Sequence, residues 1–417
     1  MIRLIHTADV HLDSPLQTLA LRDPELGERV QCASRMAFAR IVEQALTHKV
    51  AAVLIAGDLF DGAARSAKTA AFLLLQLDKL KDADIQVFYI KGNHDAENPL
   101  TGETTLPDNV HVFDARGGKR QIEGHDVWIH GVSFSGRKAE NSLLGKIPAP
   151  VSDAINIGML HTSLNGSAAH DVYAPCTEQE LIDTGFDYWA LGHIHKRQVH
   201  CEKPWIVMPG IPQGRDIGEP GPQVATLITI DNQSISISEF LTSSIEFTSV
   251  ALDVTDLSDA SDLRALAKTK LHDAAASLQS DDAIVRVVLQ GQSSLRWQWL
   301  RDLEQWQETL EQLCRDTGRL WLEKLVFNVN DAPKSLHDTT AISELSELMI
   351  AIRSEDAFDS EAIELIETVL SVLPPSERKK LLPEKQSVHD LASSLSEQGA
   401  EHVLALMRGI DEQGAAV

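Results

Sequence analysis

The stretch IQVFYIKGNHD, residues 85–95, is an apolar run rich in β-branched and aromatic residues that changes abruptly to polar residues after Gly92. Such a run predicts a buried strand that ends at the glycine. An amide, an imidazole and a carboxylate follow at once, in Asn93, His94 and Asp95. Open α/β sheets build their sites at the carboxyl ends of strands, so this stretch predicts a site at the end of a strand.

Two earlier strands end in the same way. Residues 2–7 form an apolar run that leads into Asp9 and His11, and residues 51–56 form one that leads into Asp58. The second run is apolar throughout, which is typical of a strand buried on both faces. Because the carboxyl ends of parallel strands meet at one edge of a sheet, we expect these side chains to lie near Asn93 and His94.

The segments between these strands predict helices. Apolar residues recur near helical spacing over 25–48, and a second helix is expected over 66–80. The order is therefore β-α-β-α-β, and right-handed crossovers imply neighbouring parallel strands.

After Asp95 the pattern changes to short apolar runs with few helices between them. We expect strands over 110–113, 127–134, 155–160, 188–191, 205–208, 224–230 and 234–240. His161 ends the third of these runs, and His193 and His195 follow the fourth. Two sheets packed face to face and flanked by helices fit this order best.

The chain is long enough for several domains, and we expect three parts. They are a first domain over 1–243, a small α/β unit over 244–330, and a helical region over 331–417 that begins at a linker around Pro333. The last part should contain short amphipathic helices around 342–353, 361–373, 388–396 and 401–407. From Asp331 onward there are seventeen Asp and Glu residues against seven Lys and Arg, so this region should not bind DNA.

Composition limits the function and the location. The formal charge of −24 disfavours nucleic-acid binding by the bare chain, although bound divalent cations or a basic partner could reverse the local sign. No apolar run approaches the roughly 20 residues of a membrane helix, so no membrane association is expected. The amino terminus lacks a secretory pattern, and the four scattered cysteines favour reduced thiols. We therefore expect a cytoplasmic protein.

The polar residues at the strand ends form a donor set for metals. They supply oxygen and imidazole nitrogen, without a thiolate, which suits Mn²⁺, Fe²⁺ or Zn²⁺ better than a soft metal. A carboxylate can bridge, so Asp58 is the natural shared ligand of two ions. Two ions about 3.5–4 Å apart turn a bound water into hydroxide and orient phosphoryl oxygens. His94 is the candidate that assists the leaving group, because an imidazole titrates near neutral pH.

The motifs Asp-x-His, Gly-Asp-x-x-Asp, Gly-Asn-His-Asp, a lone His and Gly-His-x-His occur in order over residues 5–195. In this respect the sequence resembles the calcineurin-like metallophosphoesterase superfamily. The resemblance implies a four-layer α/β/β/α sandwich, with His94 as the catalytic histidine. It also implies one ion held by Asp9, His11, Asp58 and His195 and a second held by Asp58, Asn93, His161 and His193. We expect two divalent ions, Mn²⁺ first, with Fe²⁺, Zn²⁺ and Mg²⁺ as alternatives.

The opening HTADVHLDSPL, the GDLFD block and the chain length resemble the DNA-repair exonuclease branch, which contains SbcD-type nuclease subunits and YhaO-like relatives. This resemblance implies that 244–330 is a capping domain that helps to position DNA. It further implies an SbcC-like coiled-coil ATPase as the partner that receives the C-terminal helices. The sequence leaves open whether the chain forms a homodimer.

Two further residues are candidates for the site. Asp61 stands where some members of the branch carry a histidine, and it could orient His94 or cap a helix or loop. Arg215 lies in a Pro/Gly-rich loop and could bind a substrate phosphate or form a surface ion pair. His6 and His130 lie within strands, and we interpret them as structural.

Three functions remain on the sequence alone. The first is a two-metal phosphodiesterase that degrades DNA as the nuclease subunit of an ATPase complex. The second keeps the metal site but acts on cyclic nucleotides, nucleotides or phosphoproteins. The third is a non-catalytic scaffold that keeps its metals for stability. The capping unit favours the first over the second, and the presence of His94 disfavours the third.

Overall fold

The computed structural model describes residues 1–14, 24–61, 66–96, 105–137, 139–164, 173–332, 341–374, 378, 381–382 and 387–414. These residues divide into two compact units. The first comprises Met1–Ser249, Ala274–Arg286 and Gly318–Glu323, and the second comprises Val250–Asp273, Val287–Thr317 and Lys324–Val417. The linker expected around Pro333 lies outside the described residues. The domain boundaries expected near residues 243 and 330 stay predictions.

The first sheet has six strands in the order β12-β11-β1-β2-β3-β4. The strands are β1 (Ile2–Thr7), β2 (Ala52–Ala56), β3 (Gln86–Ile90), β4 (Val110–Val112), β11 (Val224–Asp231) and β12 (Ser234–Leu241). β1, β2, β3 and β4 are parallel neighbours, as the β-α-β-α-β pattern predicts, and β11 and β12 add antiparallel strands beside β1.

The second sheet also has six strands, in the order β5-β6-β7-β8-β10-β9. The strands are β5 (Gly118–Gln121), β6 (Val127–Gly131), β7 (Ile155–His161), β8 (Tyr188–Gly192), β9 (Gln198–Glu202) and β10 (Trp205–Met208). The four central strands are parallel, and β5 and β9 pair antiparallel at the edges. Sequence periodicity does not predict the two edge strands, because their side chains are mostly exposed and polar.

The two sheets pack face to face through alternate residues of their strands. On β2, Leu54 joins the core between the sheets, while Val53 and Ile55 face the outer side. On β3, Phe88 lies between the sheets and Val87 on the outer side. Successive side chains of a strand point to opposite faces, so a strand covered on both sides must be apolar throughout.

Helices cover both outer faces. On the first sheet, α1 (Pro24–His48) and α2 (Ala67–Asp82) contribute Phe38 and Leu73 to the outer core. On the second sheet, α4 (Glu178–Asp183) contributes Leu181, which packs with Trp189. The Ser66 side chain caps α2 by accepting the Thr69 N–H, which satisfies a free helix donor. The layers are therefore α/β/β/α, and the expected fold class is confirmed.

A three-stranded sheet follows, formed by β13 (Ile245–Asp253), β14 (Asp282–Ser293) and β15 (Leu320–Asp331) in that order. The helix α5 (Ala260–Ser277) connects the first two strands, and α6 (Arg296–Arg301) and α7 (Leu303–Asp316) connect the last two. This is the predicted β-α-β-α-β order.

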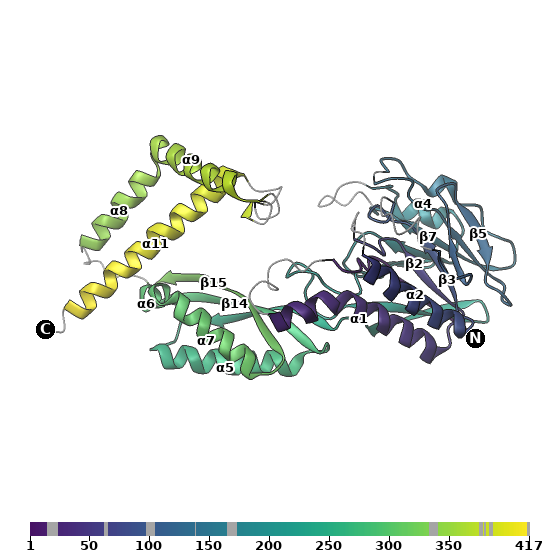
Figure 1. Ribbon diagram of the computed structural model, residues 1–417, viewed down its shortest axis with the longest axis horizontal. Helices are drawn as coiled ribbons and strands as arrows, with labels where there is room; N and C mark the ends of the chain where they lie inside the picture. Colours follow the sequence, from purple (N-terminus) through teal and green to yellow (C-terminus); the bar gives the residue numbers. More distant parts are fainter. Residues whose placement is uncertain are drawn as a thin grey trace. The chain divides into compact units, whose positions relative to one another are not determined.

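The C-terminal region includes the helices α8 (Ala341–Arg353), α9 (Asp356–Val372) and α11 (Val388–Gly414), which contact one another (Figure 1). The two helices expected over 388–396 and 401–407 are one continuous helix. Gly399 lies between them, and a glycine costs a helix only about 1 kcal/mol, so it does not break it. α11 also packs on α6, where Arg296 pairs with Glu401. Among the described helices, none is long and apolar enough to cross a bilayer.

The Gly158 site in β7 gives a stability test. A Cβ atom at Gly158 would overlap the ring of Trp189, one of the largest fully buried side chains. We expect Gly158→Ala to lower the free energy of unfolding by about 1–3 kcal/mol, because the ring or the strand must move in a close-packed core. Gly145→Ala is the control, since that position faces open space. Chemical denaturation measures both, and equal stability of the two variants would contradict tight packing around Trp189.

Candidate metal centre

The structure brings together all the donors expected from the sequence at the carboxyl ends of neighbouring strands. They follow β1, β2 and β3 of the first sheet and β7 and β8 of the second. Three groups of carboxylates and imidazoles have ligand atoms within 4.8 Å of one another. The groups are Asp9 with His11 and His195, His11 with Asp58 and His94, and Asp9 with Asp58 and His161.

Asp58 occupies the centre of this arrangement. Its Oδ2 lies 3.3 Å from His161 Nε2 and 3.9 Å from His11 Nε2. Its Oδ1 accepts the backbone N–H of His94 at 2.9 Å. Burial alone would raise the pKa of Asp58, but the facing His161 and His11 rings lower it below its usual value. A buried carboxylate held ionised in this way is suited to a cation.

His161 shows that the site fits a cation. Its Nδ1 lies 2.9 Å from the carbonyl oxygen of Ala56, which can only accept, so Nδ1 carries the ring proton of the neutral imidazole. Its Nε2 lone pair then faces Asn93 Oδ1 at 3.0 Å and Asp58 Oδ2 at 3.3 Å. Without an ion, burial lowers the pKa of His161, but the Asp58 carboxylate outweighs it and raises the pKa to about 9, so that the ring takes up a proton at Nε2. A metal cation bound by the same atoms would replace that proton.

A second set of facing acceptors lies around His195. Its Nε2 is 3.3 Å from His11 Nε2 and 3.9 Å from Asp9 Oδ1. His193 lies beside His161, with ring centroids 5.2 Å apart, and its backbone N–H donates to the Asp9 carboxylate at 3.0 Å. The donors thus fall into two adjacent sets, with Asp58 between them.

The backbone is strained where it delivers these side chains. Asp9, His11, Asp58 and His193 have φ values of 52°, 45°, 51° and 101°. Residues with a Cβ rarely adopt such angles, and they persist where the surrounding structure enforces them, often at functional sites. Backbone bonds hold the turns in place, because the Asp9 N–H donates to Gly57 O and the His11 N–H donates to Asp58 O, both at 3.0 Å.

Three motif glycines are required by close approach to the donors. A Cβ atom at Gly92 would overlap Asp58 Oδ1, and one at Gly57 would overlap the His161 ring. At Gly192 it would overlap the carbonyl oxygen of Ala56, the atom that binds His161. The glycines that precede Asp58, Asn93 and His193 therefore make room for atoms from a different part of the sequence.

Asp95 has a structural role that the sequence analysis did not predict. It is fully buried and accepts the N–H groups of Leu59, Phe60 and Gly92 at 3.2, 2.9 and 3.0 Å. Burial and the nearby Asp58 raise its pKa to about 6. Asp95 thus joins the loop after β2 to the loop after β3. The sequence signal that could have indicated this role is the position of the acid, directly after Asn93 and His94.

His94 and Asp61 lie at the open side of the donors. Asp61 Oδ1 is 3.5 Å from His94 Nδ1 and also 3.5 Å from His11 Nδ1. The pKa of Asp61 is lowered to about 2, mainly by its hydrogen bond with His11. The His94 side chain is one-third exposed, whereas His11 is buried. Asp61 therefore lies between the two rings, close enough to orient either.

Arg215 lines an open cavity beside the donors. The cavity, of about 880 Å³, is bordered by the turn after β8 and by the loop 211–223, and it is also lined by His94, His195 and Tyr173. Arg215 Nη2 lies 3.6 Å from Glu219 and 3.2 Å from His195 Nδ1. The ion pair that was the alternative for Arg215 is thus present, and the phosphate contact stays a prediction. The volume is in the range of about 300–1,000 Å³ typical of ligand sites.

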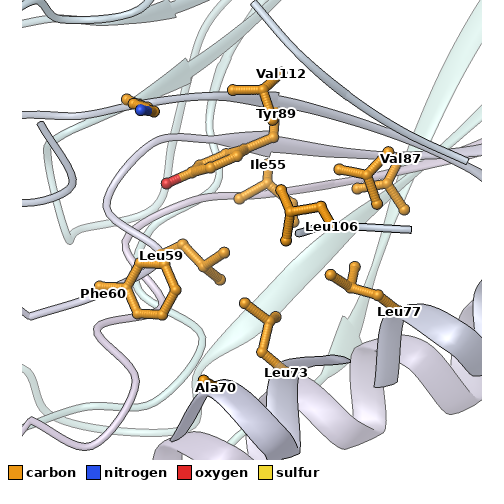
Figure 2. Close-up of a pocket in the computed structure, with 12 residues that line it drawn as sticks. Ile55, Leu59, Phe60, Ala70, Leu73, Leu77, Val87, Tyr89, Leu106 and Val112 are labelled. Atoms are coloured by element: carbon orange, nitrogen blue, oxygen red, sulfur yellow. The ribbon is translucent and has the colours of Figure 1, made fainter. Parts of the chain in front are cut away.

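A second cavity is part of the core. It lies between α2 and the strands β2 and β3, with Leu73, Leu77 and Val87 in its wall (Figure 2). Its volume is about 20 Å³, room for little more than one water molecule, and its wall is almost entirely apolar. It is not a ligand site.

His6 and His130 are satisfied within the protein. His6 contacts Tyr188 Oη and the carbonyl oxygen of Leu191, both at 3.0 Å, and burial lowers its pKa to about 3. His130 contacts Asn156 Oδ1 and the carbonyl oxygen of Pro148, also at 3.0 Å. These contacts agree with the interpretation of both as structural.

Comparison with known proteins places this site in a family. The model of the calcineurin-like phosphoesterases matches residues 2–197, and the model of the middle domain of metallophosphoesterase YhaO matches residues 247–330. An uncharacterized metallophosphoesterase YhaO from Bacillus subtilis is 34% identical over 336 residues, which cover 77% of this chain and 80% of that protein. The chain belongs to the YhaO family of calcineurin-like metallophosphoesterases. It is a metal-dependent phosphoesterase, and the calcineurin-like phosphoesterases bind two divalent ions.

More distant similarity covers the amino-terminal part. The DNA double-strand break repair protein Mre11 of Methanocaldococcus jannaschii is 28% identical over 201 residues, which are 46% of this chain and 51% of that protein. The match thus spans about half the length of the Mre11 protein. Among solved structures, a dimetal phosphatase from Danio rerio is 12% identical with a TM-score of 0.37, covering 58% of this chain and 98% of that one.

The position of Asp58 between the two sets of donors gives a test. We expect Asp58→Asn to lose both ions together, because the neutral amide cannot bridge two cations. Elemental analysis of the purified variant measures the metal content per chain. Asp114→Asn is the control, since that exposed carboxylate pairs only with Arg116 in the described structure. Loss of a single ion from Asp58→Asn would contradict the bridging role.

Proposed function

We propose that this chain is a two-metal phosphodiesterase that cleaves DNA in repair, as the nuclease subunit of a complex with an SbcC-like coiled-coil ATPase. The observation that carries the proposal is the pair of facing acceptor sets that share Asp58 beside an open cavity. The partial match to Mre11 supports DNA as the substrate. In this proposal 1–243 is the nuclease domain, 244–330 the capping domain and 331–417 the partner-docking region.

The proposed metal sites divide the donors as the motifs imply. One ion takes Asp9, His11, Asp58 and His195, and the other takes Asp58, Asn93, His161 and His193. We propose Mn²⁺ as the native metal, because oxygen and imidazole donors suit it. When bound, the pair supplies a hydroxide near neutral pH and fixes the phosphoryl oxygens for attack.

The protein's own groups act on the leaving oxygen. His94 lines the cavity, and the Asp61 carboxylate lies 3.5 Å from its Nδ1, where it can accept that N–H and orient the ring. The Nε2–H of His94 can then donate to the alkoxide that departs from phosphorus. Arg215, on the wall of the same cavity, offers a guanidinium to a neighbouring phosphate.

A nucleotide or cyclic nucleotide is the second candidate substrate. The cavity of about 880 Å³ is large enough for such a molecule, and its wall mixes polar and apolar side chains. Phosphoproteins remain within this alternative. The scaffold alternative loses its support, because the chain belongs to a phosphoesterase family and keeps His94 beside the donors.

The C-terminal helices support a protein partner. On α9, the side chains of Leu365, Val369 and Val372 are exposed at helical spacing and form one apolar stripe. Leu348 and Ile352 form a shorter exposed pair on α8. Apolar stripes at i, i+4 and i+7 are how an amphipathic helix docks against another helix. The acidity of the region argues against DNA there, so a coiled-coil chain is the fitting partner. We also propose a cytoplasmic location, on the scattered cysteines.

His94 tests the chemistry. We expect His94→Ala to keep two ions per chain but to lose about 100- to 10,000-fold in turnover of linear DNA and of bis(p-nitrophenyl) phosphate, the usual contribution of general acid–base catalysis. Nuclease assays with Mn²⁺ and metal analysis measure the two properties separately. Hydrolysis of cyclic nucleotides by the wild type with DNA left intact would select the second substrate class instead.

The stripe on α9 tests the docking proposal. We expect Val369→Asp to weaken the complex with the coiled-coil ATPase at least tenfold, because a charge would enter an apolar interface. Ser371→Asp is the matched control, since it adds the same charge at an exposed position that is not at i+3 or i+4 from any residue of the stripe. Binding is measured with the two purified subunits. Equal affinities of the two variants would remove the stripe from the interface.

A further inference from the structure

The loop 211–223 places a carboxylate directly behind one of the proposed metal ligands. Glu219 Oε1 lies 2.5 Å from Nδ1 of His195, the ring nitrogen opposite the one that faces Asp9 and His11. The Glu219 side chain is only 15% exposed, so the contact is largely shielded from water. Nothing in the metal motifs includes this residue, which lies 24 positions beyond His195.

The charge on Glu219 decides where the proton of His195 resides. Arg215 Nη2 also approaches Nδ1, at 3.2 Å, and a guanidinium can only donate. If Nδ1 were the acceptor, its lone pair would face the carboxylate at 2.5 Å, and Nε2 would carry a proton toward the ion. The shorter contact with an acceptor therefore puts the proton on Nδ1. The lone pair of Nε2 is then free for a metal.

From this geometry we propose that Glu219 is a positioning residue that holds His195 for the ion bound by Asp9, His11 and His195. The inference rests on the two-ion site proposed above. A carboxylate behind a ligand imidazole fixes the ring, selects the tautomer and strengthens the donor nitrogen.

The two proposed ions differ in this respect. His161, a ligand of the other ion, is backed by the neutral carbonyl oxygen of Ala56 at 2.9 Å, which belongs to β2. His195 is backed by a charged group on a loop. The Glu219 side chain should therefore set the affinity of one ion only, the one at His195.

The loop that carries Glu219 is built to present it. Glu219 Oε2 accepts the N–H of Arg215 at 2.7 Å, and the Gln223 side chain donates to the carbonyl oxygen of Glu219 at 3.2 Å. Gln213 anchors the beginning of the loop, where its side chain donates to the carbonyl oxygen of Ile245 at 2.8 Å. These bonds fix the main chain on both sides of Glu219.

The test is a titration of the metal-free full-length protein with Mn²⁺. Calorimetry measures the affinity of each site, and electron paramagnetic resonance distinguishes a coupled ion pair from a single ion. We expect Glu219→Ala to weaken one of two Mn²⁺ sites by about 10- to 100-fold while the other keeps its wild-type affinity. At a Mn²⁺ concentration that just fills the wild type, the signal of the coupled ion pair should give way to that of a single ion. Glu219→Gln keeps one acceptor oxygen, so its Mn²⁺ affinity at this site should lie between those of the wild type and Glu219→Ala.

Two control variants separate positioning from other effects. Asp216→Asn removes an exposed negative charge from the same loop, with no contact to His195 in the described structure. Gln223→Ala removes side-chain bonds to the main chain of the loop but no contact of the Glu219 carboxylate itself. Asp216→Asn should bind two Mn²⁺ ions as the wild type does, and Gln223→Ala should lose less affinity than Glu219→Ala.

Three results would overturn the inference. Wild-type affinity at both sites in Glu219→Ala would show that the carboxylate does not act on the ion. Equal losses in Gln223→Ala or Asp216→Asn would assign the effect to loop order or to overall charge. A wild type that binds no pair of ions would overturn the proposed function as well, which distinguishes the two failures.

Discussion

The proposed metal centre depends on imidazole nitrogens and side-chain oxygens that converge on common points, where a proton or a metal ion must lie between them. His161 Nε2 faces Asp58 and Asn93, and His195 Nε2 faces His11. Such an arrangement is unfavourable in a buried place unless a cation occupies the middle. Two other energetically unfavourable features of the backbone help to bring these donors together. The left-handed backbone angles turn the side chains inward, and the motif glycines leave room where two blocks of the sequence meet.

The sandwich makes this arrangement available. Strands covered on both faces are rigid apolar elements, and their carboxyl ends bring polar residues from distant parts of the sequence to one place. Asp95 then ties two of the ligand loops by accepting three backbone N–H groups. Glu219 stands behind His195 from a loop outside the motifs. The proposed ligands are thus supported by carboxylates that lie outside the two donor sets.

The sequence predicted the central strands and the grouping of the candidate donors, because both rest on local patterns. A continuous apolar run that ends in Gly-Asn-His is visible in eleven residues. The edge strands β5 and β9 escaped, because strands that face solvent show no apolar alternation. The roles of Asp95 and Glu219 were not predicted, for a different reason. Their partners lie far away in the sequence, and a carboxylate in a loop looks the same whether it faces water or a ligand. Gly399 misled the prediction of α11, since a helix tolerates one glycine when its faces are packed.

The proposed ligands come from both sheets of the sandwich, with Asp9, Asp58 and Asn93 on one and His161, His193 and His195 on the other. An ion bound by ligands from both sheets would crosslink the two layers. Ligands that bind only the folded state stabilise it in proportion to the logarithm of their concentration. The cellular supply of divalent metal would then govern the lifetime of the protein as well as its turnover, and starvation for the metal would expose the chain to proteolysis.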